Sequence, residues 1–437
     1  MKIAIIGSGI SGLSCAWMLS RQSPDCAVTV FEASETLGGH TATVDISLDG
    51  RDYAIDTGFI VYNTRTYPNF IALLDELGLQ GQPTEMSFSV RNPQSGMEYN
   101  GHTLNTLFAQ RGNVFKPRFW RFLREILRFN ALCKQQLNNP NNDEVTLGDL
   151  LDQNQFSEFF ALHYVLPMGA AIWSSSLGDM IQFPLSLFLR FFENHGLLDV
   201  ANRPQWMVVP GGSREYIRRM QQKLPAHVEL LTATPVRSVF RHAAGVTLQT
   251  PRGAEHFDQV IFACHSDQAL ALLGENASDD EKEILGALPY QSNDIILHTD
   301  TRHLPKQKRA WASWNYLLPV EDPTVRERQA SVTYNMNILQ GLHSPHTFCV
   351  SLNPATPVDE SKILFRAQYM HPVLNLASHD AQQQRGWING HHHSWFCGAY
   401  WYNGFHEDGV NSARDVVDQL LKSPAHTRQA HSKPVAS

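Results

Sequence analysis

The chain has 437 residues, of which 43% are hydrophobic and 18% charged, an ordinary globular composition with room for two domains. Its formal net charge of −7 argues against a general nucleic-acid binder, and no apolar run is long enough to predict a membrane span. The six cysteines contain no C-x-x-C pair, which favours free thiols in a reducing cytoplasm over a disulfide framework or a zinc site.

The N-terminus predicts a strand, a glycine turn, a helix and a second strand. A short apolar run precedes Gly7, Gly9 and Gly12, which have G-x-G-x-x-G spacing, and a second apolar run ends at Glu32. In this arrangement Gly7 makes a tight turn, Gly9 lets the backbone approach a pyrophosphate, and Gly12 brings helix and strand together. The helix N-terminus attracts phosphate, and Glu32 is placed to bind ribose hydroxyls. We therefore expect a dinucleotide here.

A glycine pair after the second strand extends this site. Gly38-Gly39 lets the backbone run along a cofactor that reaches past the first crevice, and a D-x-G step follows at residues 56–58. These segments resemble the E-A-x(n)-G-G-R pattern and the D-x-G step of the flavoprotein superfamily of amine oxidases, phytoene desaturases and protoporphyrinogen oxidases, whose nucleotide is FAD. His40 stands where that family has arginine. In this part of the chain the resemblance implies FAD contacts at Ser11, Ala33, Gly38, Gly39, His40 and Gly58.

Two apolar stretches follow in the segment 61–202. Residues 115–129 place three arginines on one face of a predicted helix and most of the apolar side chains elsewhere. Such a helix usually packs its apolar side inward, and the alternative is peripheral contact with a membrane. Residues 180–198 contain four phenylalanines and five leucines, which predict a segment of the hydrophobic core. An apolar substrate tunnel lined by part of this segment is the alternative.

The cofactor domain is predicted to resume after residue 203. Gly211 and Gly212 lead through Ser213, a plausible N-cap, into a helix. The resemblance places Val236 where the superfamily packs an aliphatic residue against adenine. Residues 254–273 then predict a strand, a small-residue turn and a helix, which is the family order.

The C-terminal part predicts a strand that ends at Gly398, a loop, and an amphipathic helix from about Gly409 to Leu421. The resemblance implies that the N-terminus of this helix faces the flavin pyrimidine, where N–H groups stabilise the reduced ring. It implies further FAD contacts at Gly398, Glu407, Gly409 and Val410. Histidines 391–393 alternate in direction on a strand and cannot converge on one ion, so we expect no metal.

The predicted chemistry is hydride transfer from a substrate carbon to flavin N5, which requires positioning and exclusion of water. His406 and Glu407 are candidate bases near the flavin, and each is also a candidate helix cap. Phe405 stands where amine-oxidising relatives carry a substrate-bracketing tyrosine, and the strand at 293–300 lacks their lysine. Both departures weaken the interpretation as an amine oxidase.

The chain resembles most specifically a bacterial subgroup described as predicted NAD/FAD-binding proteins. The shared segments are AAIWSS at 170–175, FFENHGLL at 191–198, ASWNY at 312–316 and GFHEDG at 404–409. The genomic setting of that subgroup, beside cyclopropane-fatty-acid-synthase-like methyltransferases, implies lipid chemistry by association.

We therefore predict an α/β fold in which a Rossmann-like FAD-binding domain of three segments carries an inserted mixed α/β substrate domain. The predicted ranges are 1–60, 203–285 and 385–422 for the first, 61–202 and 286–384 for the second, and 423–437 for a disordered tail. The predicted function is FAD-dependent oxidation or desaturation of a hydrophobic, fatty-acyl substrate. An amine oxidase and a non-catalytic flavin-binding redox or structural protein are the alternatives. A small hydrophobic substrate is the expected partner, and a cytoplasmic location, with membrane association as an option, is expected.

Overall fold

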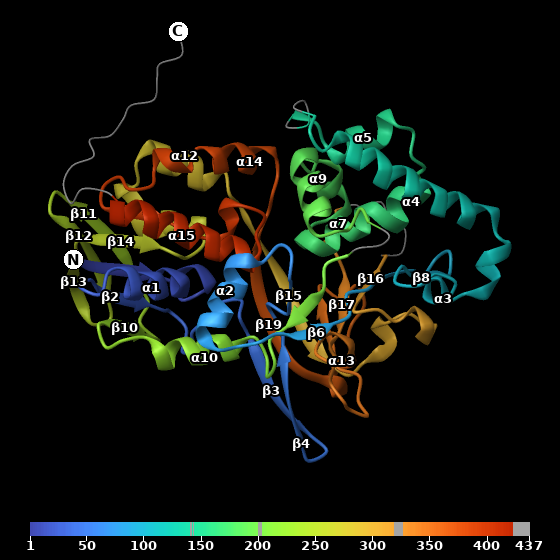
Figure 1. The fold of residues 1–437 in the computed structure, drawn as a ribbon, viewed down its shortest axis with the longest axis horizontal. Coiled ribbons are helices and arrows are strands. Elements are labelled where there is room, and N and C mark those ends of the chain that lie inside the picture. The colour runs from blue at the N-terminus through green and yellow to red at the C-terminus, as the bar shows by residue number, and fades with distance from the viewer. Residues whose placement is uncertain (140–141, 143, 200–202, 319–326, 423–437) are drawn as a thin grey trace, which may run out of the picture.

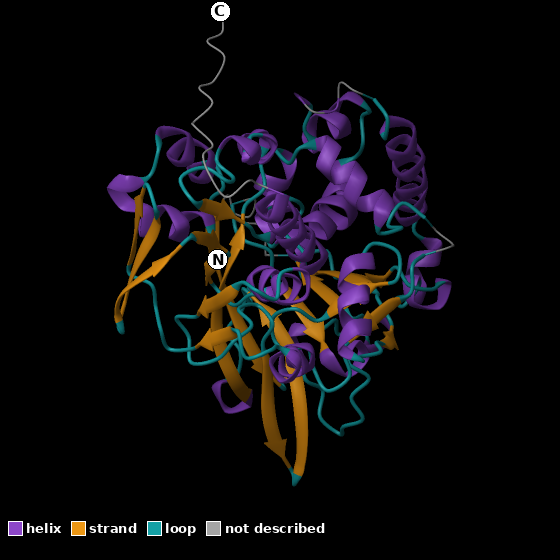
Figure 2. Ribbon diagram, turned by 60° about the vertical axis from the view of Figure 1, so that its left-hand side comes forward, coloured by secondary structure: helices purple, strands orange, loops and turns teal. Residues whose placement is uncertain are grey.

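The computed structural model describes residues 1–139, 142, 144–199, 203–318 and 327–422. They form two halves side by side, each built on its own β-sheet (Figure 1). Seen from a second side, many of the helices lie above the strands (Figure 2). The tail at 423–437, predicted to be disordered, lies outside the described residues.

A parallel five-stranded sheet is the centre of the first half. Its strand order is β10 (Val228–Leu231), β2 (Ala27–Phe31), β1 (Lys2–Ile6), β14 (Gln259–Phe262) and β20 (Ser394–Phe396). The strands come from three separate parts of the chain, so the predicted α/β fold with a three-segment cofactor sheet is confirmed. The residue ranges of the two domains stay a prediction.

Both faces of this sheet are covered, which explains why its strands are mostly apolar. Ile3 and Ile5 of β1 pack in a buried cluster with α1 (Ile10–Gln22) and α15 (His406–Lys422), whereas Ala4 and Ile6 pack in another on the opposite face. That face carries an antiparallel sheet and three helices: β11 (Ser238–His242), β12 (Gly245–Thr250), β13 (Gly253–Phe257), α11 (Ser266–Leu273), α12 (Asp279–Gly286) and α14 (Leu376–Gln383).

A seven-stranded sheet is the centre of the second half. Its order is β19 (Ile363–Pro372), β15 (Tyr290–His298), β18 (Cys349–Leu352), β17 (Val332–Asn335), β16 (Trp314–Leu317), β7 (Phe88–Asn92) and β8 (Met97–Asn100). Only the β16–β7 pair among them is parallel. Its helices are α3 (Leu104–Leu107), α4 (Pro117–Gln136), α5 (Leu147–Gln153), α6 (Glu158–Phe160), α7 (Leu166–Trp173), α8 (Leu177–Ile181), α9 (Leu185–Asn194) and α13 (Met336–Leu339).

The apolar run at 180–198 forms α9 and the end of α8, and its four phenylalanines are buried, as the core interpretation predicted. From Pro117 on, the basic stretch at 115–129 forms the first part of α4, a surface helix that buries Phe119, Phe122 and Phe129. No helix in the described ranges combines the length and the apolar content that a membrane span requires.

A further buried cluster packs α1 and α15 against two more helices. It contains Phe70 of α2 (Pro68–Leu77), Tyr216 of α10 (Arg214–Lys223) and Val410 of α15. The remaining strands are the hairpin β3 (Thr43–Leu48) and β4 (Arg51–Asp56) and the small sheet β5 (Val61–Asn63), β9 (Trp206–Val208) and β6 (Gln82–Thr84).

Helix α15 begins at His406, three residues before the predicted start. The carboxylate of Asp408 accepts a hydrogen bond from the backbone N–H of Phe405 at 2.9 Å and so holds the first turn. Acidic residues near the start of a helix also interact favourably with its dipole. The early start places His406 in the helix rather than in the preceding loop.

Candidate active site

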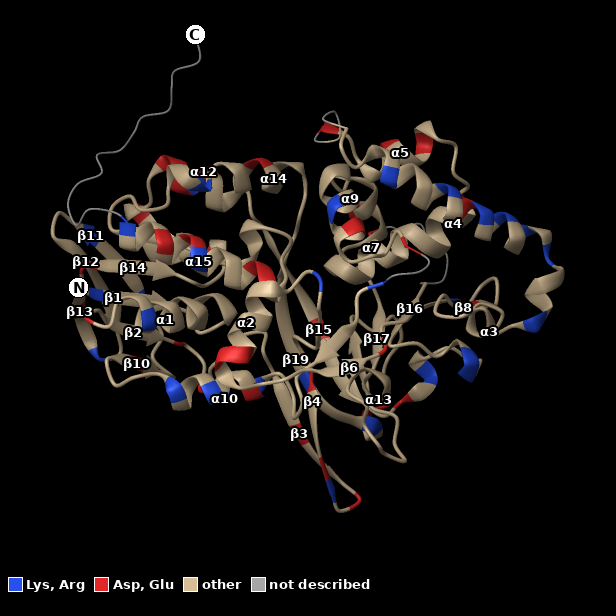
Figure 3. Ribbon diagram, in the orientation of Figure 1, with Lys and Arg blue, Asp and Glu red and all other residues tan. Residues whose placement is uncertain are grey.

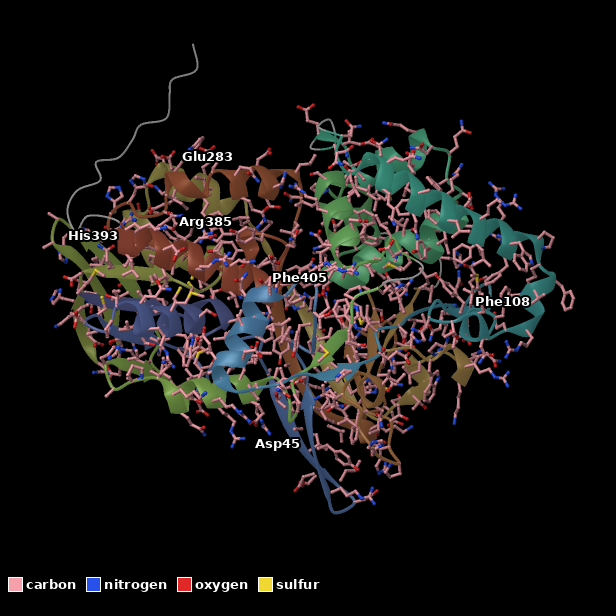
Figure 4. All side chains as sticks on the ribbon, viewed as in Figure 1. Asp45, Phe108, Glu283, Arg385, His393 and Phe405 are labelled. Carbon is pink, nitrogen blue, oxygen red and sulfur yellow. The ribbon has the colours of Figure 1, made fainter. Side chains whose placement is uncertain are left out.

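A cavity of about 1030 Å³ lies between the two halves. Its lining begins at the carboxyl ends of the parallel strands: Ile6 ends β1, Phe31 ends β2 and Ala263 follows β14. From there the lining extends to residues of α7, β16 and β17. In open α/β sheets ligands bind at this edge of the strands. We refer to the part beside the glycine turn as the nucleotide end and to the part beside α7 as the apolar end. Phe405 lies where the two halves meet (Figure 4).

The glycine turn forms one wall of the nucleotide end. Gly7 has φ +104°, in the region that only glycine adopts freely, and its N–H donates to the carbonyl oxygen of Phe31 at 2.8 Å. A Cβ at Gly12 would lie 2.0 Å from the Gly7 carbonyl oxygen, so α1 packs too close for any side chain. A Cβ at Gly9 would meet no atom within 4 Å, and Gly9 lines the cavity. Of these three glycines, only Gly9 has open space at the position that a Cβ would occupy.

The N-terminus of α1 faces the same space. Gly9 is its N-cap, no side chain caps the helix, and Ile10 and Ser11 line the cavity. The uncapped N–H groups of a helix N-terminus bind phosphate. This is the geometry that a pyrophosphate requires.

Glu32 lies beside the glycine turn at the nucleotide end. Its Oε2 accepts hydrogen bonds from the backbone N–H of Ser8 at 3.0 Å and from Ser8 Oγ at 2.6 Å, and its Oε1 accepts from the N–H of Ser34. Ala33 and Val236 line the cavity nearby. A carboxylate in this position can accept hydrogen bonds from ribose hydroxyls in place of its present donors.

The glycine pair lies between the two ends. A Cβ at Gly39 would lie 3.3 Å from the Cα of Gly9, and a Cβ at Gly58 would lie 2.0 Å from the carbonyl oxygen of His40. Both glycines and His40 line the cavity. Asp56, which precedes Gly58, is buried and accepts hydrogen bonds from Thr43 and Ser213, so its role is to hold this wall. Burial raises the pKa of Asp56 to about 6.

Three histidines meet beside this wall, where the sequence predicted only one. The ring of His40 lies 6.0 Å from that of His265 and 5.4 Å from that of His371, and Tyr369 is at 5.3 Å. Burial and the neighbouring imidazoles lower the pKa of His40 to about 3 and that of His371 to about 4. His371 also bonds Ser174 Oγ at 2.9 Å. The cluster is therefore uncharged at neutral pH, unlike the arginine of the family pattern.

Phe405, which precedes α15, and His406, its first residue, both line the cavity. The His406 ring stacks on Phe59 with centroids 3.5 Å apart, and its Nε2 bonds Thr41 Oγ1 at 3.0 Å. Tyr216 contributes a longer contact to the same nitrogen at 3.3 Å. Burial lowers the pKa of His406 well below its usual value. His406 is thus a fixed, uncharged imidazole in the cavity wall.

Glu407 does not reach the cavity, although the sequence predicted it as a cofactor contact and a candidate base. Its carboxylate accepts hydrogen bonds from the backbone N–H groups of Asn69 and Phe70 at 3.0 and 2.8 Å, and from Asn69 Nδ2 at 2.7 Å. Those N–H groups are in the first turn of α2. Glu407 is therefore an anchor that caps α2 from another part of the chain.

Two more predicted contacts lie behind the cavity wall. A Cβ at Gly409 would lie 2.6 Å from Ile10 Cγ2, so this glycine lets α15 approach α1. Val410 is 1% exposed and belongs to the buried cluster that α15 shares with α1, α2 and α10. Gly398 does line the cavity, at the end of β20.

The apolar end is built from side chains of several helices and strands. They are Met86, Phe88, Tyr99, Tyr164, Met168, Ile172, Trp173, Phe191, Leu197, Trp206, Trp314, Tyr334 and Leu352. Glu32 is the only carboxylate among the described residues of the whole lining, and it belongs to the nucleotide end. The apolar end therefore has no negative charge to offer a cationic ligand.

Sequence reasoning missed several residues of this site. His265 and Gln268 follow β14, so the convergence of parallel strands at their carboxyl ends could have found them. His371 and Tyr369 lie on β19, far along the chain, and no motif marks them. No group of three or more His, Cys, Asp or Glu within the described ranges has the arrangement of a metal site.

Comparisons with known proteins agree with this geometry. Residues 10–348 match the family model of flavin containing amine oxidoreductase. A segment of 38 residues is 57% identical to coproporphyrinogen III oxidase of Staphylococcus aureus (strain NCTC 8325 / PS 47), and the match spans 9% of this chain and 8% of that protein.

Solved structures share the whole fold at low sequence identity. A CLA-producing fatty acid isomerase from P. acnes has TM-score 0.67 and 14% identity, over 96% of this chain and 98% of that one. Cyclohexylamine oxidase from Brevibacterium oxydans IH-35A has TM-score 0.66 and 16% identity, over 96% and 99%. Putrescine oxidase bound to putrescine has TM-score 0.65 and 15% identity, over 97% and 100%. The chain therefore belongs to the flavin-containing amine oxidoreductase family, an FAD-dependent class of oxidoreductases.

Proposed function

We propose that this protein uses FAD to oxidise or desaturate a hydrophobic substrate, a fatty-acyl lipid. The observation that carries the proposal is the apolar end of the cavity, where aromatic and aliphatic side chains continue directly from the nucleotide end. Apolar walls bind an alkyl chain by removing it from water, at about 0.8 kcal/mol for each buried CH₂ group.

The residues at the nucleotide end fit FAD. The open space above Gly9, the uncapped N-terminus of α1 and the carboxylate of Glu32 supply the contacts that a pyrophosphate and a ribose need. We propose that the cofactor is held by the cavity-lining members of the predicted set, namely Gly7, Gly9, Ser11, Glu32, Ala33, Gly38, Gly39, His40, Gly58, Val236 and Gly398. When bound, FAD supplies a hydride acceptor.

The protein itself positions the substrate and excludes water. Phe405 and His406, which line the cavity at the junction of its two ends, are the proposed contacts with the reacting groups. Desaturation also releases a proton, and an uncharged imidazole such as His406 can accept one, at the cost of a buried charge. Glu407 has no part in this step because α2 occupies its carboxylate.

Two observations favour this substrate over an amine. The apolar end carries no carboxylate among its described lining residues, so an ammonium group would lack a counter-charge. The ring of Phe405 stacks directly on that of Phe191 with centroids 4.9 Å apart, which leaves no room for a substrate between these two rings. The fold neighbours include both amine oxidases and a fatty acid isomerase, so the fold does not decide between them.

The proposal includes a cytoplasmic enzyme that reaches its lipid by peripheral contact with a membrane. All six cysteines are free thiols, which suits a reducing compartment. Cys15 and Cys397 lie with their Sγ atoms 3.7 Å apart and are not bonded as a disulfide.

Anaerobic bleaching of the bound flavin tests the proposal. Purified holoprotein would be mixed with acyl lipids, amines and porphyrinogens in separate reactions, and the flavin absorbance followed. We expect reduction by acyl lipids. Reduction by amines alone would establish an amine oxidase, and a flavin that no substrate reduces would indicate a non-catalytic flavoprotein.

A further inference from the structure

An exposed surface that is both aromatic and basic lies at one edge of the second half. Its apolar side chains are Leu104, Val114, Phe115 and Trp120, which are 77%, 41%, 86% and 48% exposed. Its cations are Arg111, Lys116, Arg118, Arg121 and Arg124. We refer to these nine residues as the basic aromatic tip. Figure 1 shows α3 and the start of α4 at the edge opposite β11, and Figure 3 shows the Lys and Arg residues along α4 and the turn before it.

The tip is held in place from beneath. Phe108 packs on Phe119 and Trp120 with ring centroids 5.4 and 5.6 Å apart, and it lies at this outer edge (Figure 4). Trp120 Nε1 donates to the carbonyl oxygen of Val114 at 2.7 Å. The exposed side chains therefore stand on an ordered support. An exposed phenylalanine such as Phe115 adds nothing to solubility, so its position here indicates an interaction surface.

The charge of the tip is opposite to that of the protein. Residues 99–124 contain five Lys and Arg residues and no Asp or Glu, whereas the chain as a whole has a net charge of −7. Arg111 donates its hydrogen bonds to the neutral oxygens of Asn105 and Phe108, so its charge stays available. Arg121 approaches Glu125 only to 3.9 Å. A compact excess of positive charge around exposed aromatic side chains matches an anionic lipid surface.

The tip adjoins the apolar end of the cavity. Gly101 and His102, which are exposed, belong to the cavity lining, and α3 begins two residues later at Leu104. Met86 and Tyr99 continue the lining inward from there. An acyl chain that entered at Gly101 would thus start from the face that carries the tip.

We propose that the basic aromatic tip docks on an anionic phospholipid bilayer and that the cavity takes its acyl chain from that bilayer beside Gly101 and His102. The apolar side chains would enter the headgroup region, and the cations would pair with lipid phosphates. The second part rests on the proposed function, because it concerns the same substrate. The docking itself does not depend on turnover.

Flotation of the FAD-loaded protein with lipid vesicles tests the docking. We expect binding to vesicles of phosphatidylcholine mixed with phosphatidylglycerol, little binding to phosphatidylcholine alone, and weakening by salt. Lys116→Glu/Arg124→Glu should weaken the binding at least about 30-fold, because each cation near such a surface contributes about 1 kcal/mol. Phe115→Ser should weaken it about 10-fold.

Matched changes elsewhere provide the controls. Arg51→Glu/Arg218→Glu alters the charge equally on β4 and α10, and Phe240→Ser removes a phenylalanine that is 46% exposed on β11. Both controls should bind vesicles like the unaltered protein. Equal loss in the controls, or absence of binding by the unaltered protein, would overturn the docking. A dimer that dissociates on Phe115→Ser would also overturn it, since the tip would then bind a second copy.

Flavin bleaching by the same acyl lipid in detergent separates the two proposals. If the docking is right, the acyl lipid should reduce the flavin of the tip variants at the normal rate in detergent. It should reduce that flavin slowly when it is supplied in vesicles. Normal reduction from vesicles by these variants would overturn the delivery route. Failure of every lipid in detergent, with vesicle binding intact, would overturn the proposed function and leave the docking supported.

Discussion

The two ends of the cavity are built in different ways. At the nucleotide end the backbone forms the wall: Gly7 and Gly12 bring chain segments into contact, and the N-terminus of α1 presents its N–H groups. At the apolar end side chains form the wall, and they come from α7, α9 and strands spread over most of the chain.

This difference indicates which part of the site is general and which is particular to this protein. A backbone-built wall recognises a group that every family member binds, and it tolerates few changes, since glycine is the only residue that fits. A side-chain wall can change its shape one residue at a time without altering the fold. We therefore expect mutations at the two ends to separate cofactor binding from substrate binding.

The largest effect should come from Gly12→Ala. The added Cβ would lie 2.0 Å from the Gly7 carbonyl oxygen, so α1 must shift, and we expect the free energy of unfolding to fall by about 3 kcal/mol with loss of FAD. Chemical denaturation and flavin absorbance measure both. Gly286→Ala, where a Cβ meets no atom, is the control.

Gly9→Ala should leave stability unchanged and weaken FAD binding. Retained affinity for FAD in this variant would refute the interpretation that the backbone forms the wall.

A smaller effect is expected from Glu407→Gln, behind the cavity wall, where the carboxylate caps α2. The amide offers one acceptor oxygen where the carboxylate offers two, so the N–H of Asn69 or Phe70 loses its partner. We expect a loss of about 2 kcal/mol in the free energy of unfolding and an unchanged pH profile of kcat. A rate that collapses while stability is retained would mean that Glu407 is a base after all.

At the apolar end, Met168→Gln should lower kcat/KM for an acyl lipid about 10-fold, because a polar amide replaces part of the apolar wall. FAD content should not change. Met168→Leu, which keeps the wall apolar, serves as the control. If the Gln variant also lost its flavin, the two ends would not be separable.

The smallest effect should come from Asp408→Asn and should depend on pH. Burial raises the pKa of Asp408 to about 7 in the folded protein, above its ordinary value. The native state then binds the proton more tightly than the unfolded chain, so stability that is fully present below the ordinary pKa of 3.8 is lost as the pH rises through 7. The variant should therefore gain at least about 1 kcal/mol of stability over the unaltered protein between pH 4 and pH 8. Calorimetry at these two pH values measures the gain, and a variant that loses stability relative to the unaltered protein over this range would contradict the sign.

Much of the nucleotide end could be predicted because its residues lie close together in the sequence. The strand, the three glycines and Glu32 span the first 32 residues, and their spacing follows from the geometry of one strand, one turn and one helix. The α/β fold and the FAD-binding family followed from them and from the later segments. The start of α15 was predicted three residues late because the Asp408 cap is a local contact that periodicity does not reveal.

The rest depends on contacts between distant residues. The sequence alone determined that a dinucleotide-binding turn is present, because short-range sterics permit only glycine at its close approaches. Only the tertiary structure decided that Glu407 caps α2, 337 residues away from Phe70, and that His265 and His371 join His40. The burial that makes those imidazoles neutral, and the joining of scattered aromatic side chains into one wall, arise when the two halves pack together.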